Sequence, residues 1–371
     1  MHRREFLQAL ALASIAGNSP VPAFASDANS LYRLPERRHA ASLIHLTDCH
    51  AQLLPQYHRE PSINIGAGNS AGRPPHLTGE ALLRAYGLRR GSRLAYAFTH
   101  LDYVELAQRY GKMGGFAYLA TLVKLIQSQR PGAVLVDGGD SWQGSATALW
   151  TRGSDMVAAS KLLGVEVMTG HWEFTLGAER VMELIRHDMD GSIEFVAHNV
   201  FTRDFGDRVF PAVVMKEIAG MQVAIIGQAY PYTPIANPAH LVPDWTFGIH
   251  EQSLRETIAS ARKAGAGAIV LLSHNGVDVD LKLASRVGGL TAILGGHTHD
   301  PLLKPIRVKN GDGETLVANA GSNGKFLGVL DLFARQGRIA CDYALLPVFS
   351  NLLEPDTQMD ALITQIRQPF E

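Results

Sequence analysis

The chain has 371 residues, with 34 Lys and Arg against 35 Asp and Glu, which gives a formal net charge of −1. This length permits one large α/β domain or two ordinary ones. Because neither sign of charge is concentrated in one segment, the composition argues against a polyanion-binding surface, and nucleic acid is not an expected partner.

The N-terminus has the composition of an export signal. Arg3 and Arg4 precede an apolar run over residues 9–16, and residues 23–25 (Ala-Phe-Ala) form a small-x-small cleavage site. This order is the twin-arginine pattern, which directs a protein to export. We therefore expect residues 1–25 to be a signal peptide and the mature protein to lie in the periplasm without a membrane anchor. A retained anchor is the alternative, but the apolar run is well short of the ~20 residues that span a membrane.

The chain has only two cysteines, Cys49 and Cys341. One bridge between them is compatible with an oxidising compartment, but nothing in the pattern requires a disulfide scaffold. We expect Cys49 to be reduced and to fill space.

Short apolar runs alternate with helical segments along most of the chain. Fully apolar strands that alternate with helices indicate an α/β sheet covered on both faces. Strand-like pieces that follow each other without helices indicate antiparallel additions near the end. The expected strands are residues 42–46, 133–136, 165–168, 193–196, 223–226, 269–272, 292–294, 315–318, 329–333 and 339–345, and the expected helices are residues 116–129, 178–187, 252–264 and 359–367.

Three domain-level segments follow from this pattern. The layered α/β domain is expected over residues 40–347, with a long surface insertion over residues 55–92. Residues 348–371 are expected to be a connector and one helix.

Polar side chains of one chemical kind follow the ends of the predicted strands. Because alternation has a period of two, each Asp-x-His or His-x-His pair places both side chains on one side of an extended segment or tight loop. Each motif alone has an ordinary structural explanation, such as a cap or a turn. All of them in order, each after a buried strand, favour one site made of Asp48, His50, Asp140, His171, His274, His297 and His299.

Two carboxylates and five imidazoles fit a dinuclear divalent metal site. A lone carboxylate such as Asp140 can bridge two cations, and the two glycines before it let the backbone approach closely. Metals about 3.5–4 Å apart share a water whose pKa falls towards neutrality, so a bridging hydroxide is available at physiological pH. Without metal, such a cluster is costly to bury.

This ordered set resembles the calcineurin-like metallophosphoesterases, especially the 5'-nucleotidase branch, whose pattern is Asp-x-His, Gly-Asp, Gly-Asn-His-Glu, a lone His and Gly-His-x-His. The resemblance covers residues 42–345 and implies a layered αββα domain with mixed β-sheets. It also implies two metal positions that share Asp140. One position has Asp48, His50 and His299, and the other has His171, His274 and His297.

Two residues depart from the pattern of that branch. His171 stands at the position of the family's Asn, and Trp172 stands at the position of its His near the leaving group. An imidazole in place of an amide oxygen suits manganese, or zinc, better than magnesium. An indole neither donates nor accepts a proton in the useful pH range, whereas an alkoxide leaving group benefits from a general acid. A thiol leaving group has a pKa near 8.5 and needs far less help.

These departures, together with residues 137–145, 227–234 and 243–248, resemble the SoxB subfamily of thiosulfohydrolases. The resemblance implies hydrolysis of the sulfonate group from a cysteine-bound thiosulfonate on the carrier SoxYZ, with release of sulfate, and other Sox components are further candidate partners. It implies that Asp140, His171 and Trp172 are catalytic.

The same resemblance implies a channel for the carrier's C-terminal arm, for which Trp172, Tyr230 and Asn199 are candidates. Core packing is the alternative for Trp172. Glu173 is a candidate acceptor that orients His171.

Members of the family carry a second, C-terminal domain, and we expect residues 348–371 to lead to such a domain, missing from this chain. Two other functions remain open. One is a periplasmic 5'-nucleotidase or cyclic phosphodiesterase, and the other is a truncated, non-catalytic paralogue that binds the carrier.

Overall fold

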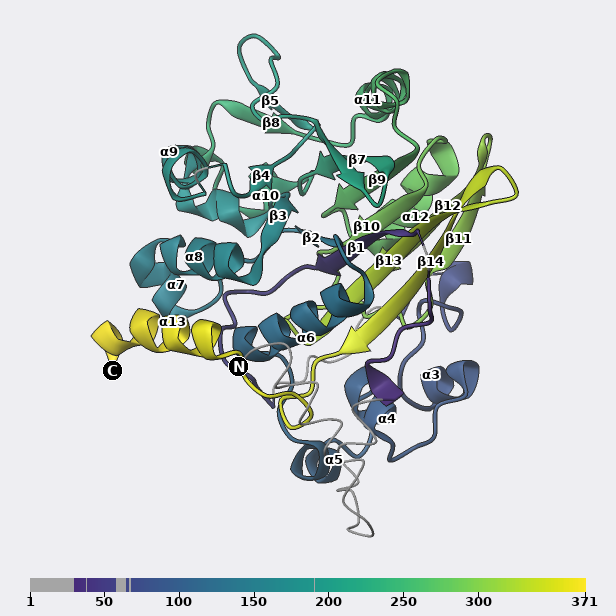
Figure 1. The fold of residues 1–371 in the computed structure, drawn as a ribbon. Coiled ribbons are helices and arrows are strands. Elements are labelled where there is room, and N and C mark those ends of the chain that lie inside the picture. The colour runs from purple at the N-terminus through teal and green to yellow at the C-terminus, as the bar shows by residue number, and fades with distance from the viewer. Residues whose placement is uncertain (1–29, 38, 58–64, 67, 190) are drawn as a thin grey trace.

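The computed structural model describes residues 30–37, 39–57, 65–66, 68–189 and 191–371. The predicted signal peptide, residues 1–25, lies outside these ranges. Two six-stranded mixed sheets pack face to face, and helices cover both outer faces (Figure 1). The predicted αββα architecture is therefore confirmed.

The first sheet has the strand order β14-β13-β1-β2-β3-β4. Strand β1 lies at its centre, parallel to β2 and antiparallel to β13. Strands β2, β3 and β4 continue in parallel, so their carboxyl ends share one edge of the sheet. The strands are β1 (Ala41–Leu46), β2 (Val134–Asp137), β3 (Val165–Met168), β4 (Glu194–Phe195), β13 (Phe326–Arg335) and β14 (Arg338–Pro347).

The second sheet has the order β11-β12-β10-β9-β7-β6, and β5 and β8 form a separate antiparallel pair. Strands β7, β9, β10 and β12 are parallel to one another. The strands are β5 (Val200–Thr202), β6 (Val213–Ile218), β7 (Met221–Gln228), β8 (Trp245–Phe247), β9 (Ala268–Ser273), β10 (Ala292–Gly295), β11 (Ile306–Asn310) and β12 (Gly313–Asn319).

Alternating apolar residues build the layers. In β1, Leu43 faces the core between the two sheets, whereas Ile44 faces the helices on the outer face of the first sheet. In β9, Val270 faces the inter-sheet core and Leu271 faces the helices on the outer face of the second sheet. Fully buried strands of this kind have no polar face, which is why the sequence shows continuous apolar runs.

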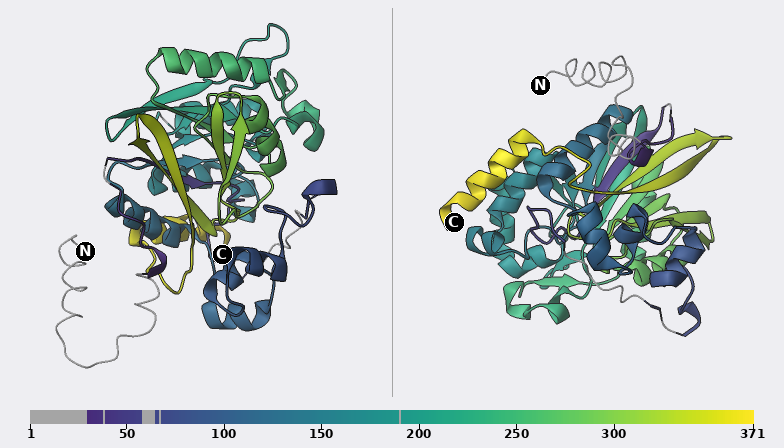
Figure 2. Two further views of the ribbon diagram at one scale, coloured as in Figure 1. Left: turned by 90° about the vertical axis from the view of Figure 1, so that its right-hand side faces the viewer. Right: turned by 90° about the horizontal axis from the view of Figure 1, so that it is seen from below.

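The helices divide between the two outer faces. Helices α6 (Phe116–Gln129), α7 (Ala146–Thr151), α8 (Ser154–Leu163), α9 (Ala178–Glu183) and α13 (Thr357–Arg367) contribute to the core of the first sheet. Helices α11 (Glu251–Lys263) and α12 (Val277–Arg286) cover the second sheet. Two further views show the helical layers on either side of the paired sheets (Figure 2). Short helical segments are η1 (Gly68–Ser70), η2 (Trp172–Leu176), η3 (Leu184–Asp188), α10 (Thr233–Ala236), η4 (Ala239–Leu241) and η5 (Gln368–Phe370).

The predicted insertion is more regular than its composition suggests. Helix α3 (Gly79–Tyr86) lies inside residues 55–92, and α4 (Arg93–Phe98) and α5 (Tyr103–Tyr110) follow it. They are too short to give a clear helical period. Helices α4 and α5 share a separate apolar cluster with residues near Phe326 and Phe349.

Other elements also differ from expectation, and the short strands β5, β8 and β11 were not predicted. The helix predicted over residues 178–187 is α9 followed by a π-type turn, η3. Strand β6 was missed because Lys216 and Glu217 interrupt its apolar residues. It pairs with β7 through a turn at Ala219 and Gly220, which both have positive φ.

The segment after β14 packs against the domain. Helix α13 buries Met359 and Ile363 and contacts α6 and α8. The division at residue 347 stays a prediction. Within the described ranges, the structure has no helix with both the length and the apolar character needed to cross a membrane.

A buried ion pair fixes the start of the described chain to the first sheet. Arg130 donates from Nε and Nη2 to the two carboxylate oxygens of Asp331, each at 2.9 Å, and Ser42 Oγ donates to Asp331 at 2.6 Å. The Nη2 atom also donates to the Pro35 carbonyl at 2.6 Å. Because both charges are buried, the loss of either partner leaves the other uncompensated.

We therefore predict that Asp331→Asn lowers the free energy of unfolding by about 3 kcal/mol. The reason is that a neutral amide cannot satisfy the buried guanidinium. Chemical denaturation of the mature chain measures this change. Arg90→Ala is the matched control, because Arg90 pairs with Glu80 and Asp102 on the surface and its loss should leave the midpoint almost unchanged. Equal shifts for both variants would contradict the prediction.

Candidate metal centre

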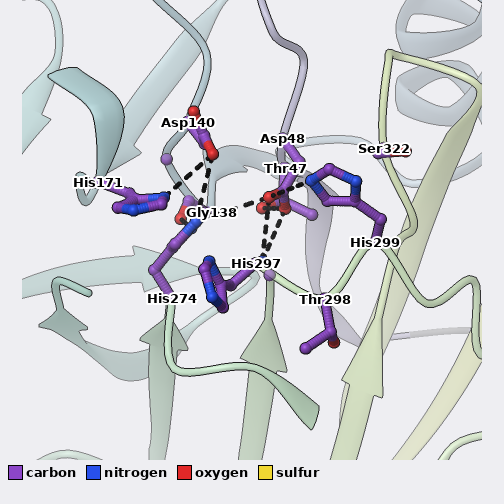
Figure 3. Close-up of polar contacts among 12 residues, drawn as sticks. Thr47, Asp48, Gly138, Asp140, His171, His274, His297, Thr298, His299 and Ser322 are labelled. Atoms are coloured by element: carbon purple, nitrogen blue, oxygen red, sulfur yellow. Dashed lines mark hydrogen bonds and ion pairs between the residues drawn. The ribbon is translucent and has the colours of Figure 1, made fainter. Parts of the chain in front are cut away.

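The candidate metal ligands gather where the carboxyl edges of the two sheets meet. Asp48 and His50 follow β1, Asp140 follows β2 and His171 follows β3, all from the first sheet. From the second sheet, His274 follows β9, and His297 and His299 follow β10. Six of these side chains are labelled in Figure 3, which shows them gathered around one shared space: Asp48, Asp140, His171, His274, His297 and His299. The structure thus brings all seven predicted ligands together, and their role in binding metal stays a prediction.

The seven side chains form two neighbouring groups. In each group, the donor atoms lie within 4.8 Å of one another. One group is Asp48, His50, Asp140 and His299, and the other is His171, His274 and His297.

Asp140 lies between the two groups, with one oxygen towards each. Its Oδ1 is 3.5 Å from His50 Nδ1, and its Oδ2 is 3.1 Å from His171 Nδ1 and 3.8 Å from His274 Nε2. A carboxylate in this position can bind two cations at once. This geometry agrees with the bridging position that the sequence predicts for Asp140.

The donor set fits two divalent cations. Among the described residues, His171 Nε2, His274 Nε2 and Asp140 Oδ1 are buried without a hydrogen-bond partner. His50 Nε2 and His299 Nε2 approach to 2.8 Å. Buried polar atoms without partners are costly, and imidazole lone pairs that converge with carboxylates are the donors that transition metals prefer. The cluster is therefore suited to hold a dinuclear metal centre.

Burial favours the neutral, metal-binding form of two of the imidazoles, those of His171 and His297. It lowers the pKa of His297 to about 4, and the neighbouring His274 lowers it further. Burial also lowers the pKa of His171, with added repulsion from His274 and His297. These two neutral imidazoles do not need to lose a proton when a cation binds.

The two carboxylates differ in their surroundings. Burial acts to raise the pKa of Asp48, but His274, His299 and His50 outweigh it and lower the pKa overall. Burial raises the pKa of Asp140, and the negative charges of Asp48 and Glu173 raise it further. Asp140 therefore depends most on a nearby cation to stay ionised.

The backbone at the site is strained in a way that fixes these side chains. Asp48, His50, Asp140, His297 and His299 have φ values of 52°, 49°, 61°, 74° and 56°. Non-glycine residues seldom adopt this left-handed region, and such residues cluster at functional sites. Five of the seven candidate ligands share this conformation.

Hydrogen bonds hold the ligands from behind. Asp48 accepts the hydroxyl of Thr47 at 2.5 Å and the amide of His297 at 3.0 Å. His274 Nδ1 lies 2.6 Å from the carbonyl of Gly138, which leaves its Nε2 to face the site. A Cβ on Gly296 would lie 2.3 Å from the Thr47 hydroxyl, so only glycine fits there.

Trp172 and Tyr230 stand beside the ligands. The Trp172 ring lies 6.2 Å from His50 and 6.1 Å from His171, and its side chain is 38% exposed. The Tyr230 ring lies 4.2 Å from His171 and 4.0 Å from His297. Core packing, the alternative for Trp172, does not fit this exposure.

Asn199 lies differently from the sequence-based expectation, whereas Glu173 is an acceptor for His171, through the backbone of His171 instead of its ring. Asn199 is fully buried, and its amide binds backbone groups of Ala229 and Gly248 instead of lining a channel. Glu173 accepts the backbone amide of His171 at 2.7 Å and does not bind the ring. A hydrogen bond from a side chain to the backbone of a distant loop does not depend on the residue type in that loop, so the sequence shows no motif for it.

Sequence reasoning missed Thr47 and His45. Thr47 directly precedes Asp48, and this neighbouring position was the only feature of the sequence that could have indicated its hydrogen bond to Asp48. His45 lies in β1 with its side chain fully buried.

Comparisons with known proteins place this fold and site in a family. No protein-family model matches the chain. A structure of sulfate thiohydrolase SoxB from Thermus thermophilus, in complex with glycerol, matches with a TM-score of 0.85 and 38% identity, over 91% of this chain and 62% of that chain. A 5'-nucleotidase precursor from the same organism matches with a TM-score of 0.67 and 23% identity, over 89% of this chain and 59% of that chain, which shows a common fold.

Curated 5'-nucleotidase sequences are also similar to this chain. The 5'-nucleotidase of Rattus norvegicus is 26% identical over 275 residues, which cover 69% of this chain and 47% of the rat protein. The chain spans about half the length of the curated relatives it matches.

The layered fold and the two adjacent groups of nitrogen and oxygen donors define a class, that of metal-dependent hydrolases. Within that class, the chain belongs to the SoxB/5'-nucleotidase family of calcineurin-like phosphoesterases.

His45 makes the stability of the chain sensitive to acid. Burial lowers its pKa to about 3, and neither ring nitrogen has a hydrogen-bond partner. The unfolded chain binds this proton below pH ~6.5, while the folded chain does so only near pH 3. Neutral His45 therefore contributes its full share to the free energy of unfolding above pH ~6.5. That free energy decreases as the pH falls, by about 2 kcal/mol at pH 5.

We predict that His45→Leu flattens the fall in the free energy of unfolding between pH ~6.5 and ~4. Denaturant titrations at several pH values, in the presence of a chelator, measure the slope for both proteins. Parallel pH profiles for the variant and the parent chain would contradict this assignment.

Proposed function

We propose that this chain is a thiosulfohydrolase. In the proposed reaction, water attacks the sulfonate sulfur of a cysteine S-thiosulfonate, the sulfur–sulfur bond breaks, and sulfate leaves. The persulfide sulfur takes the electron pair of that bond, and the water releases its protons to solvent. The proposed substrate is the charged cysteine arm of the carrier SoxYZ.

The observation that carries the proposal is the position of Trp172, whose ring lies beside His50 and His171 of the donor cluster. The 5'-nucleotidase pattern has a histidine at this position, where it can protonate an alkoxide. An indole has no such proton to give. The 38% identity to a SoxB structure over 91% of this chain supports the same conclusion.

The low basicity of a sulfur leaving group explains why a general acid is dispensable at this site. A thiol or persulfide leaves as a stable anion near neutral pH, because its conjugate acid has a pKa of about 8.5 or lower. An alkoxide is a far stronger base and leaves slowly without a proton donor. A site that lacks a general acid therefore favours sulfur leaving groups.

The chain's own residues would bind and orient the reactants. Two divalent cations would supply positive charge for the sulfonate oxygens and lower the pKa of a water. Asp140 and His171 lie at the junction of the two donor groups, so they would set the relative position of nucleophile and sulfonate. Manganese is the proposed metal and zinc the alternative, because five imidazoles and two carboxylates suit either ion better than magnesium.

The surface beside the donor cluster suits a peptide. Tyr232 is 47% exposed and Ile235 is 83% exposed, and Tyr232 contacts Tyr230 with ring centroids 6.0 Å apart. We propose that these exposed apolar side chains, together with Trp172, form an apolar rim that contacts the peptide arm by burial of apolar surface. We propose that this rim receives the carrier arm in the periplasm, after twin-arginine export.

The function is tested with the mature chain loaded with manganese. We expect sulfate release from thiosulfonate-charged carrier and little hydrolysis of AMP or a cyclic nucleotide, measured under the same conditions. Efficient turnover of AMP without sulfate release would identify a 5'-nucleotidase instead. Tight carrier binding without sulfate release would identify a non-catalytic carrier-binding protein. Elemental analysis of the purified protein decides between manganese and zinc.

The role of Trp172 gives a gain-of-function prediction. We expect Trp172→His to raise AMP hydrolysis by about a hundredfold, because it supplies the missing general acid. Trp172→Phe is the matched control, since it removes the indole without adding an acid. Steady-state kinetics at equal metal content measure both variants. Equal AMP hydrolysis by the two variants would refute the link between this position and leaving-group chemistry.

A further inference from the structure

Glu173 is a buried carboxylate that joins two ligand-bearing loops. Its Oε1 accepts the amides of Ser141 and Trp142 at 2.7 and 3.3 Å. Its Oε2 accepts the amides of Asp140 and His171 at 3.1 and 2.7 Å. One carboxylate thus satisfies four backbone donors from the loop after β2 and the loop after β3.

The Oε2 atom connects the two candidate ligands most directly. Asp140 and His171 both donate their backbone amides to it, and their side chains meet at 3.1 Å between Asp140 Oδ2 and His171 Nδ1. The same loops touch through their backbones, since a Cβ on Gly139 would lie 3.0 Å from Gly170 Cα. The position of Glu173 therefore sets the separation of the bridging carboxylate and the imidazole beside it.

The charge of Glu173 is unusual. Its side chain is fully buried, and among the described residues no Lys, Arg or His side chain pairs with it. Two divalent cations carry four positive charges, while the candidate ligands supply two negative charges, from Asp48 and Asp140. A third carboxylate next to the cluster offsets part of the remaining excess.

We propose that Glu173 is a positioning residue that assembles the dinuclear centre: it fixes the Asp140 and His171 loops in one geometry and adds a negative charge behind them. The proposal applies to any substrate, because it concerns metal binding alone. It assigns no contact between Glu173 and a substrate.

Glu173→Gln tests both parts of the proposal. An amide has only one oxygen, so in either orientation its NH₂ group faces two backbone N–H donors, and two of the four hydrogen bonds are lost. The negative charge is lost as well. We expect the weaker manganese site to bind about ten- to a hundredfold less tightly, as is typical when groups that support metal ligands are removed.

The experiment compares manganese binding by the mature chain, Glu173→Gln and Asp331→Asn. Asp331 is a matched control, because it is a buried carboxylate that pairs with Ser42 near the start of β1, at the end away from Asp48. Chelated proteins are titrated with Mn²⁺ while the electron paramagnetic resonance signal is recorded, and thermal unfolding is followed in chelator. We expect Asp331→Asn to lose stability but to keep both metal sites and the spectrum of a coupled manganese pair. Glu173→Gln should lose the coupled spectrum.

Wild-type affinities and an unchanged spectrum for Glu173→Gln would overturn the proposal and leave Glu173 with a packing role. If Glu173→Gln does not fold, Glu173→Asp replaces it, since it keeps the charge but shortens the reach. An intermediate loss of affinity supports the proposal, and wild-type binding by Glu173→Asp refutes it. No substrate enters these measurements, so failure of the thiosulfohydrolase proposal would not alter their outcome.

Discussion

The contact between the two sheets holds the candidate metal centre together. The inter-sheet core consists of apolar residues from both sheets, such as Leu43 of β1 and Val270 of β9. It sets the carboxyl ends of β1, β2 and β3 against those of β9 and β10, from which all seven candidate ligands extend. A slip of one residue would turn every side chain of a strand to the opposite face. Apolar packing therefore determines the geometry of a polar cluster that would be costly to bury alone.

The ligand loops add a second constraint. Five candidate ligands have left-handed backbone, which costs about 1–3 kcal/mol each for residues other than glycine. Hydrogen bonds offset this cost, for example between the amide of Asn323 and the carbonyl of Asp48 at 2.7 Å, and between the amide of Asp48 and the carbonyl of Gly139 at 2.8 Å. The loops are held by backbone pairing, so the side chains are positioned before any ligand binds.

The sequence predicts those parts of the site whose residues lie close together in the chain, and it misses those whose partners are distant in the chain. Asp48 and His50, or His297 and His299, are two residues apart after apolar strands, and this local pattern predicts both their proximity and their chemistry. Glu173 and Asn199 carry no such pattern, because their partners are backbone groups up to 49 residues away. Strand β6 was missed because two charged residues interrupt its apolar pattern, and only pairing with β7 defines it.

Three consecutive residues of one loop carry three separable tasks. His171 points into the donor cluster, Trp172 lies half exposed beside it, and Glu173 turns inward to four backbone amides. Glu173 accepts the backbone amide of His171, and the side chain of residue 172 takes no part in this hydrogen bond. The residue at position 172 can therefore change without moving His171. Relative to the 5'-nucleotidase pattern, this loop differs at two adjacent positions, with His171 in place of an asparagine and Trp172 in place of a histidine. Under the proposed function, the first change alters the donor set of the metal centre, and the second matches the lower proton demand of a sulfur leaving group.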